Sequence, residues 1–189
     1  MKTVVKNRSS LESIIGKAQE FITAQGLKIE LAYQVDDSVL EVISQRSKEA
    51  SSMYFVSVEM LQKRLENGCF LLFKDKELIG HIFAHKHQVN KYAVYERSSL
   101  WISPEYRSYN LGLFLMRQLT ELYANDFLIS IARKPTVHYY NELLGMSCIT
   151  LSEMSTMLVE ALEKIGKLRD ELQYKYYVNP CFDSKIRQL

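Results

Sequence analysis

Residues 100–115 read LWISPEYRSYNLGLFL, and this stretch decides how the chain is interpreted. The stretch begins with the end of a strand expected from Tyr92 to Ser103, which Pro104 ends. From Leu111 the apolar residues recur at helical spacing as far as about Tyr123. The stretch therefore predicts a strand that passes through a tight loop directly into an amphipathic helix.

The loop in this stretch has the features of an anion-binding site. The first N–H groups of a helix have no partner inside the helix, and the helix dipole adds about half a positive charge at that end. Such a helix N-terminus binds phosphate. Arg107 can add a charge-assisted hydrogen bond, Asn110 tolerates a left-handed backbone, and Gly112 permits close approach of a ligand.

The surrounding elements predict an α/β domain. We expect helices over about 11–25, from Asp36 or Asp37, from Ser57 to Asn67-Gly68, over 111–123, over 136–144 and after Thr156, and strands over 28–33, 69–73, 78–87, 92–103, 127–132, 146–151 and 174–178. The alternation of strands and helices after Tyr92 is typical of a mixed sheet with helices on its faces. Because the sequence has neither a repeat nor a linker, we treat residues 1–189 as one domain.

The helix expected after Thr156 has a narrow apolar stripe of Ala161, Ile165, Leu168 and Leu172. We expect this stripe to pack on the sheet of the same chain. A contact between two subunits, and so a homodimer, is the alternative.

Composition excludes several classes of protein. The chain has 189 residues, 47% of them hydrophobic, and a net charge of +2. No apolar run approaches the roughly 20 residues of a membrane span, and no secretory signal is evident, so we expect a cytoplasmic protein without membrane contact. The charge is too small for nucleic-acid binding by a basic stripe. However, residues 81–140 carry 7 basic and 4 acidic groups, a surplus that suits a small anionic ligand.

The cysteines and histidines do not predict a metal site. Cys69, Cys148 and Cys181 are widely spaced, and we expect them to be reduced and mostly buried. His81, His85 and His87 share one face of the third strand, but the first two would lie about 13 Å apart along it. We therefore expect a half-exposed strand face there, with substrate contact as an alternative.

Three motifs resemble the GNAT-type N-acetyltransferases. The acetyl-CoA loop of that family, Arg/Gln-x-x-Gly-x-Gly/Ala, is similar to Arg107-Ser-Tyr-Asn110-Leu-Gly112, preceded by Pro104-Glu105-Tyr106, with Asn110 replacing the first glycine. Residues 60–80 resemble the family's helix and its second and third strands. Tyr139-Tyr140-Asn141-Glu142-Leu143-Leu144-Gly145-Met146 is similar to its Tyr-x-x-x-Gly-Phe signature, with one extra residue and Met for Phe. The matches cover about residues 28–152.

The resemblance implies a GNAT-like mixed, mostly antiparallel sheet flanked by helices, with an added N-terminal helix and, over 153–189, a C-terminal helix and closing strand. It implies transfer of an acetyl group from acetyl-CoA to an amine of a small molecule, peptide or protein in a ternary complex. The cofactor-binding residues that it implies are Trp101, Ile102, Ser103, Arg107, Ser108, Tyr109, Asn110, Leu111, Gly112 and Leu113. For Trp101, packing in the core is the alternative that we prefer.

The same resemblance gives candidate catalytic residues. Tyr140 is the candidate proton donor to the departing thiolate, with Tyr139 as its rival because of the extra residue before Gly145. Glu96 is the candidate base; alternatively, it is a solvated charge at the strand end and water removes the proton.

Two other functions compete with catalysis on a small amine or peptide. The first is a catalytically weak or inactive GNAT-fold protein that binds CoA or a protein partner. The second, an aminoacyl-tRNA-acetylating toxin of the same fold, would require a strongly basic surface, which the net charge disfavours.

Overall fold

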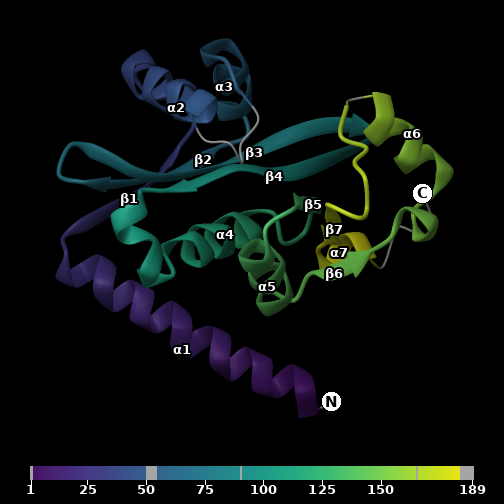
Figure 1. Ribbon diagram of the computed structural model, residues 1–189, viewed down its shortest axis with the longest axis horizontal. Helices are drawn as coiled ribbons and strands as arrows, with labels where there is room; N and C mark the ends of the chain where they lie inside the picture. Colours follow the sequence, from purple (N-terminus) through teal and green to yellow (C-terminus); the bar gives the residue numbers. More distant parts are fainter. Residues whose placement is uncertain (1, 50–54, 90, 165, 184–189) are drawn as a thin grey trace. The chain divides into compact units, whose positions relative to one another are not determined.

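The computed structural model describes residues 2–49, 55–89, 91–164 and 166–183. Seven strands form a sheet in the order β1-β2-β3-β4-β5-β7-β6 (Figure 1). β4 and β5 pair in parallel, whereas β1 with β2, β2 with β3, β5 with β7 and β6 with β7 pair antiparallel. The expected mixed, mostly antiparallel sheet with helices is confirmed.

The strands and helices follow the expected order. The strands are β1 Leu27–Ala32, β2 Cys69–Lys74, β3 Glu77–Val89, β4 Tyr92–Ile102, β5 Phe127–Ala132, β6 Ser147–Ile149 and β7 Lys175–Val178. The helices are α1 Lys2–Ala24, α2 Asp37–Glu49, α3 Val58–Leu65, α4 Leu111–Leu122, α5 Pro135–Leu143, α6 Thr156–Lys164 and α7 Pro180–Asp183, with 3₁₀-helices η1 Pro104–Tyr109 and η2 Leu151–Glu153. The short α7 was not predicted.

The chain divides into two compact units, each built from separate segments. Residues 13–85 and 98–119 form the first, which we call the loop unit because it contains η1 and the start of α4. Residues 1–12, 86–97 and 120–189 form the second, which we call the C-terminal unit. A single domain over the whole chain stays a prediction.

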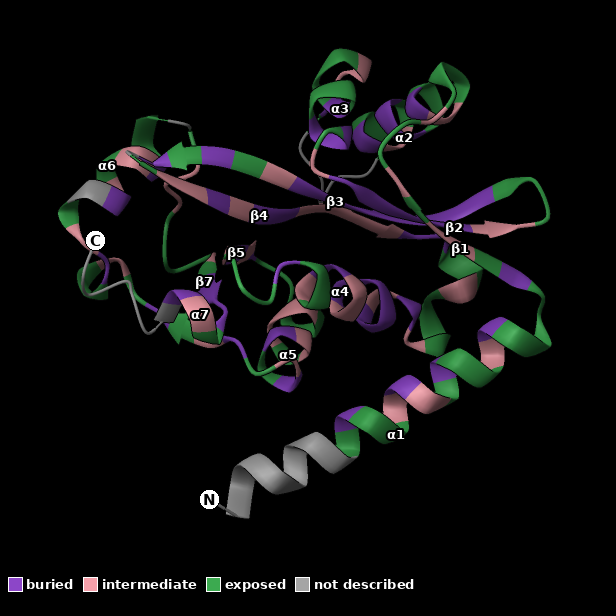
Figure 2. Cartoon of the chain, turned by 180° about the vertical axis from the view of Figure 1, so that it is seen from behind, coloured by how far each residue is buried: buried purple, intermediate pink, exposed green. Residues whose placement is uncertain are grey.

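The core of the loop unit lies between two helices and a hairpin. α2 and α3 lie side by side (Figure 1), and Figure 2 shows most of β2 and of the first part of β3 as buried. The Ser57 hydroxyl accepts a hydrogen bond from the Met60 N–H at 3.2 Å, as expected of an N-cap. The buried apolar residues of this cluster are Leu40, Ile43, Val56, Leu61, Leu65, Cys69, Leu71, Leu78 and Phe83.

The second half of α1 belongs to the loop unit. Ile15, Ala18 and Ile22 are buried and recur at helical spacing. The helix ends before Gly26, which has a φ of 60°. Lys74 on β2 donates a hydrogen bond to the Gln25 carbonyl, so the end of α1 is attached to the sheet.

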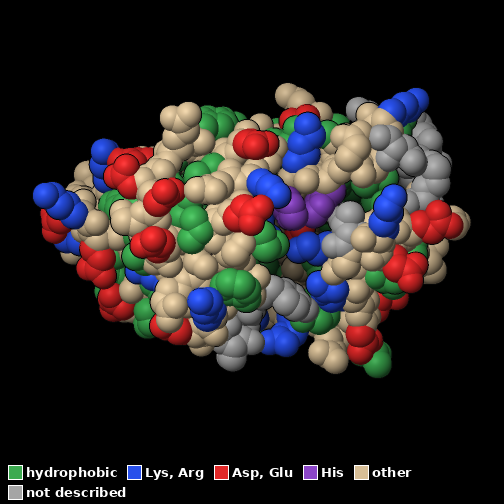
Figure 3. Space-filling model, turned by 90° about the horizontal axis from the view of Figure 1, so that it is seen from above, with side chains coloured by type: hydrophobic (Ala, Val, Ile, Leu, Met, Phe, Trp, Pro, Cys, Tyr) green, Lys and Arg blue, Asp and Glu red, His purple; other side chains and the backbone are tan. Residues whose placement is uncertain are grey.

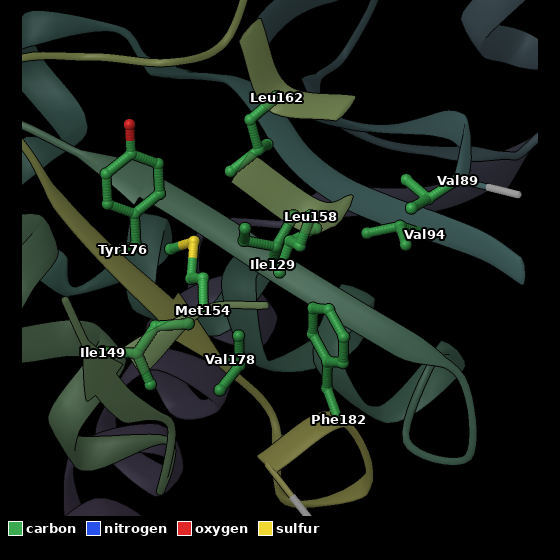
Figure 4. Close-up of a cluster of buried hydrophobic side chains, with 10 residues drawn as sticks. All are labelled: Val89, Val94, Ile129, Ile149, Met154, Leu158, Leu162, Tyr176, Val178 and Phe182. Atoms are coloured by element: carbon green, nitrogen blue, oxygen red, sulfur yellow. The ribbon is translucent and has the colours of Figure 1, made fainter. Parts of the chain in front are cut away.

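The core of the C-terminal unit gathers residues from distant parts of the sequence. Figure 4 shows Val89, Val94, Ile129, Ile149, Met154, Leu158, Leu162, Tyr176, Val178 and Phe182 packed together. α6 contributes through Leu158 and Leu162, and β7 through Tyr176 and Val178. β7 therefore closes the sheet as expected, but between β5 and β6 rather than at an edge.

The C-terminal helix is shorter than predicted, and only part of its apolar stripe packs as expected: Ala161 and Leu168 lie against the core of the C-terminal unit. α6 ends at Lys164, Gly166 has a φ of 68°, and the Leu168 N–H donates to the Leu162 carbonyl at 3.0 Å. This arrangement ends a helix because glycine adopts positive φ without strain. Leu172 lies beyond the helix and is 95% exposed; Ile165 lies outside the described residues.

Among the residues that the structure describes, no helix is long and apolar enough to cross a membrane. Acidic and basic side chains are interspersed on the face seen in Figure 3, unlike a continuous basic stripe. Cys69, Cys148 and Cys181 form no disulfide with one another, but only Cys69 is buried, so the expectation of mostly buried cysteines is wrong.

Candidate active site

The turn after β4 combines a short 3₁₀-helix with a left-handed residue. η1 begins at Pro104, and the Tyr106 N–H donates to the Ser103 carbonyl at 2.9 Å. Asn110 then adopts a left-handed backbone, with φ 57° and ψ 20°. Asn is one of the few residues other than Gly that enter this region. The left-handed backbone expected at Asn110 is confirmed, and it leads the chain directly into α4.

The first turn of α4 presents three successive amides. The Phe114 N–H donates to the Asn110 carbonyl at 3.0 Å. The N–H groups of Leu111, Gly112 and Leu113 precede this bond and have no acceptor inside the helix. Leu111 and Leu113 are buried, which fixes the start of the helix, whereas Gly112 is half-buried. Three converging amides at a helix N-terminus can bind a phosphate group.

Two further contacts hold the turn against the sheet. The Arg107 Nε donates to the Ile102 carbonyl at 2.9 Å, and this contact uses one of the five N–H donors of the guanidinium. The Ser103 N–H donates to the Ile79 carbonyl of β3 at 2.8 Å. Ser108, in the middle of the turn, is exposed. The predicted cofactor-binding residues 101–113 therefore form one continuous strand, turn and helix of the loop unit.

The turn also contacts α1, which the sequence did not predict. The Phe21 ring stacks on the Tyr109 ring, with centroids 3.7 Å apart and planes 11° apart. Phe21 lies one helical turn after the buried Ala18, so the buried face of α1 sets its position. The only sequence signal was that Phe21 belongs to the apolar face of an amphipathic helix.

Trp101 is neither fully buried nor open. The Arg46 guanidinium of α2 lies 4.0 Å from the centroid of its ring, in cation–π geometry. The Arg46 Nη2 also donates to the Leu78 carbonyl at 2.8 Å. Arg46 thus covers the indole and links α2 to β3.

β4 is distorted just before Trp101. Ser99 has a φ of 54°, unusual for a serine inside a strand. Its carbonyl oxygen lies 2.7 Å from the Nδ1 of His81 on β3. His81 is 0% exposed and His87 is 7% exposed, so the half-exposed strand face expected for these histidines is wrong at both.

Glu96 lies in a buried ion-pair cluster, which corrects the expectation of a solvated strand-end charge. Its carboxylate oxygens lie 2.8 Å from the His87 Nε2 and 3.0 Å from the Lys167 Nζ. Burial would raise the pKa of Glu96, but the hydrogen bond from His87 and the positive charge of Lys167 outweigh it and lower the pKa to about 2. Lys167, which follows the Gly166 helix end, was not predicted to contact Glu96.

The two candidate tyrosines differ in exposure. Both are in α5, where Tyr139 is 52% exposed and Tyr140 is half-buried. Burial, with a smaller effect of Tyr139, raises the pKa of Tyr140, so its phenol stays protonated at neutral pH. Tyr140 can therefore donate a proton, and it is the less exposed of the two tyrosines.

α5 is attached to the sheet through Asn141. Asn141 is 0% exposed, donates to the Ser130 hydroxyl at 3.3 Å, and accepts a hydrogen bond from Arg97 on β4. Successive strand residues point to opposite faces, so Arg97 faces α5 and Glu96 faces away from it. Glu96 and the α5 tyrosines therefore lie on opposite faces of the sheet.

The comparisons with known proteins identify the family. The sequence model of the Acetyltransferase (GNAT) family matches residues 37–146, more than half of the chain. The chain therefore belongs to the GNAT acetyltransferase family. No curated protein gave a significant match to the sequence.

Solved structures share the fold at low sequence identity. N-acetylglutamate synthase from Neisseria gonorrhoeae, complexed with coenzyme A and N-acetyl-glutamate, is 15% identical with a TM-score of 0.60 over 81% of this chain and 34% of that one. Rv2747 from Mycobacterium tuberculosis, in complex with CoA, is 9% identical, with a TM-score of 0.59; the match covers 80% of this chain and 98% of Rv2747. Arabidopsis thaliana Naa50, in complex with the bisubstrate analogue CoA-Ac-MVNAL, is 10% identical, with a TM-score of 0.55; the match covers 80% of this chain and 96% of Naa50. This chain thus spans about a third of the gonococcal enzyme.

Proposed function

We propose that this protein transfers an acetyl group directly from acetyl-CoA to an amine while both are bound. The observation that carries the proposal is the left-handed backbone of Asn110 directly before α4, so that the amides of Leu111, Gly112 and Leu113 form the open N-terminus of that helix. These amides hold the pyrophosphate of CoA, and Arg107 adds a positive charge beside it. Complexes of the three structural relatives with CoA or a CoA analogue support this assignment of the cofactor.

The acceptor that we propose is a primary α-amine. One relative was crystallised with N-acetyl-glutamate and another with a peptide-bearing analogue. N-acetyl-glutamate carries its acetyl group on the α-amine of glutamate, and a peptide has an α-amine at its N-terminus. We therefore take free amino acids and peptide N-termini as the first acceptors to test.

The reaction needs a proton donor for the departing thiolate and a proton acceptor for the attacking amine. Attack by a neutral amine on the thioester gives a tetrahedral intermediate, whose collapse forms the amide and releases the CoA thiolate. Tyr140 donates the proton to that thiolate. A carboxylate with a pKa of about 2 accepts protons poorly at neutral pH. We therefore propose that water takes the proton from the amine, and that Glu96→Gln changes kcat by less than about tenfold.

The test measures binding and turnover separately. Acetyl-CoA at 100 times its Kd should raise the free energy of unfolding by about 2.7 kcal/mol. CoA release is then followed with amino acids, polyamines and peptides as acceptors. An unchanged melting temperature would refute the cofactor site, whereas binding without turnover on any amine would favour a non-catalytic CoA-binding protein.

The tyrosines provide a matched pair of variants. Tyr140→Phe should lower kcat at least about tenfold, because a general acid contributes about 10²–10⁴-fold, and Tyr139→Phe should leave kcat nearly unchanged. The reverse pattern would assign the proton donor to Tyr139. Full activity of both variants would exclude a tyrosine as the acid.

A further inference from the structure

The distortion of β4 at Ser99 is held from two directions. A serine enters positive φ at a cost in free energy, so its surroundings must hold it there. The Arg64 Nη1 donates to the Ser99 hydroxyl at 2.8 Å, and the His81 ring contacts the Ser99 carbonyl at 2.7 Å. Arg64 and His81 are both buried.

The hydrogen bond from His81 has a defined direction. A carbonyl oxygen only accepts, so the Nδ1 of His81 carries the hydrogen and the ring is the Nδ1–H tautomer. Burial lowers the pKa of His81 to about 3, so the ring stays neutral. Its buried Nε2 has no hydrogen-bond partner among the residues that the structure describes. Burying a nitrogen without a hydrogen bond costs free energy, and an apolar residue at this position would avoid that cost. Packing alone therefore does not explain a histidine here, whereas the hydrogen bond to Ser99 does.

The orientation of the His81 ring is fixed by its aromatic neighbours. Trp101 stacks on it with centroids 5.9 Å apart and planes 12° apart, and Phe83 packs against it nearly edge-on, at 5.9 Å and 71°. The imidazole therefore cannot turn freely, and Nδ1 stays directed at Ser99.

Fixing the Ser99 carbonyl also fixes the N–H of Leu100, the next residue. The Ser99 carbonyl and the Leu100 N–H belong to one planar trans peptide and point in opposite directions. Holding the oxygen on the β3 side directs the N–H to the other side of β4. The parallel ladder with β5 runs only from Val94 to Arg97, so Leu100 lies beyond its last pair.

We propose that His81 is a positioning residue for acyl transfer, which holds the Ser99–Leu100 peptide so that the Leu100 N–H donates to the thioester oxygen as it gains negative charge. This role rests on the function proposed above. The amide acts directly on the reacting oxygen, and His81 acts through the peptide.

The test compares three substitutions on β3. His81→Leu removes the donor and should lower kcat at least tenfold while changing the Kd of acetyl-CoA less than threefold. His81→Asn keeps an N–H at nearly the same place and should retain kcat within threefold. Ile82→Val, at the next residue of β3, changes a buried side chain on the opposite face of the strand and leaves the contact between His81 and Ser99 in place. It should lower the melting temperature and keep kcat within threefold.

Each outcome is decisive. Wild-type kcat in His81→Leu, or an equal loss of kcat in all three variants, would overturn the proposal. If His81→Leu does not fold, His81→Phe, which keeps an aromatic ring between Trp101 and Phe83 and removes only the N–H that reaches the Ser99 carbonyl, should still lower kcat at least tenfold, and full activity would refute the role. A wild-type protein that neither binds nor turns over acetyl-CoA would instead overturn the proposed function.

Discussion

Removing the charge of Glu96 should destabilise the protein in a pH-dependent way. The pKa of Glu96 is lowered from 4.5 to about 2 because His87 and Lys167 outweigh the opposing effect of burial. Each pH unit of this lowering is worth about 1.4 kcal/mol, so the ionised group contributes about 3 kcal/mol above pH 5. A carboxyl with a lowered pKa stabilises the fold above its unfolded pKa, and that contribution is lost as the pH falls toward 2.

The assay is denaturant unfolding of wild type and Glu96→Gln at pH 5 and pH 3. From the two pKa values, the contribution of Glu96 falls by about 2 kcal/mol over this range. The difference in free energy of unfolding between wild type and variant should shrink by that amount. Staying below pH 5 avoids the range in which ordinary histidines titrate.

The control is Glu59→Gln, on an exposed face of α3. Glu59 lies 3.5 Å from Lys63 with a side chain that is 78% exposed, and such pairs contribute less than about 1 kcal/mol. The difference in free energy of unfolding between wild type and Glu59→Gln should change by less than about 0.5 kcal/mol between the two pH values. If the difference for Glu96→Gln is equally constant, the ion-pair cluster does not hold this carboxyl ionised and the reasoning fails.

Three further predictions concern the turn after β4, its contact with α1, and the buried Asn179 of the C-terminal unit. Asn110→Val should cost about 1–2 kcal/mol of unfolding free energy and weaken acetyl-CoA binding, whereas Asn110→Gly should preserve both, because the backbone is left-handed there; equal Kd values from calorimetry would contradict this. Phe21→Ala should raise the Kd of acetyl-CoA about twofold to tenfold, since an aromatic pair is worth about 0.5–1.5 kcal/mol and Tyr109 loses its partner; Phe21→Tyr is the control. Asn179→Ala should cost about 3 kcal/mol or more because four backbone groups lose their partner; a loss no larger than that of the exposed Asn125→Ala in urea unfolding would refute it.

The turn could be predicted because its determinants are local. Pro104 ends a strand, Asn110 suits a left-handed backbone, and the leucines after it have helical spacing. Each of these signals acts within a few residues. The same holds for the Ser57 cap.

The surroundings of the site could not be predicted because they depend on distant contacts. His81 meets Ser99, Phe21 meets Tyr109, and Lys167 meets Glu96 across 71 positions. Charge patterning along one strand cannot show that a carboxyl is buried between two such partners. The overlong C-terminal helix had a different cause. Gly166 is a local signal for a helix end, but the prediction gave more weight to the apolar spacing that continues past it.

The position of β7 has a consequence for biosynthesis. Phe127–Ala132 and Ser147–Ile149 leave the ribosome before Lys175–Val178, the segment that joins them. Until it arrives, the facing backbone edges of the two earlier strands have no neighbour, and open edges promote association between nascent chains. A protein shortened before Lys175 would keep that hazard permanently, so Lys175–Val178 protect against aggregation as well as completing the sheet.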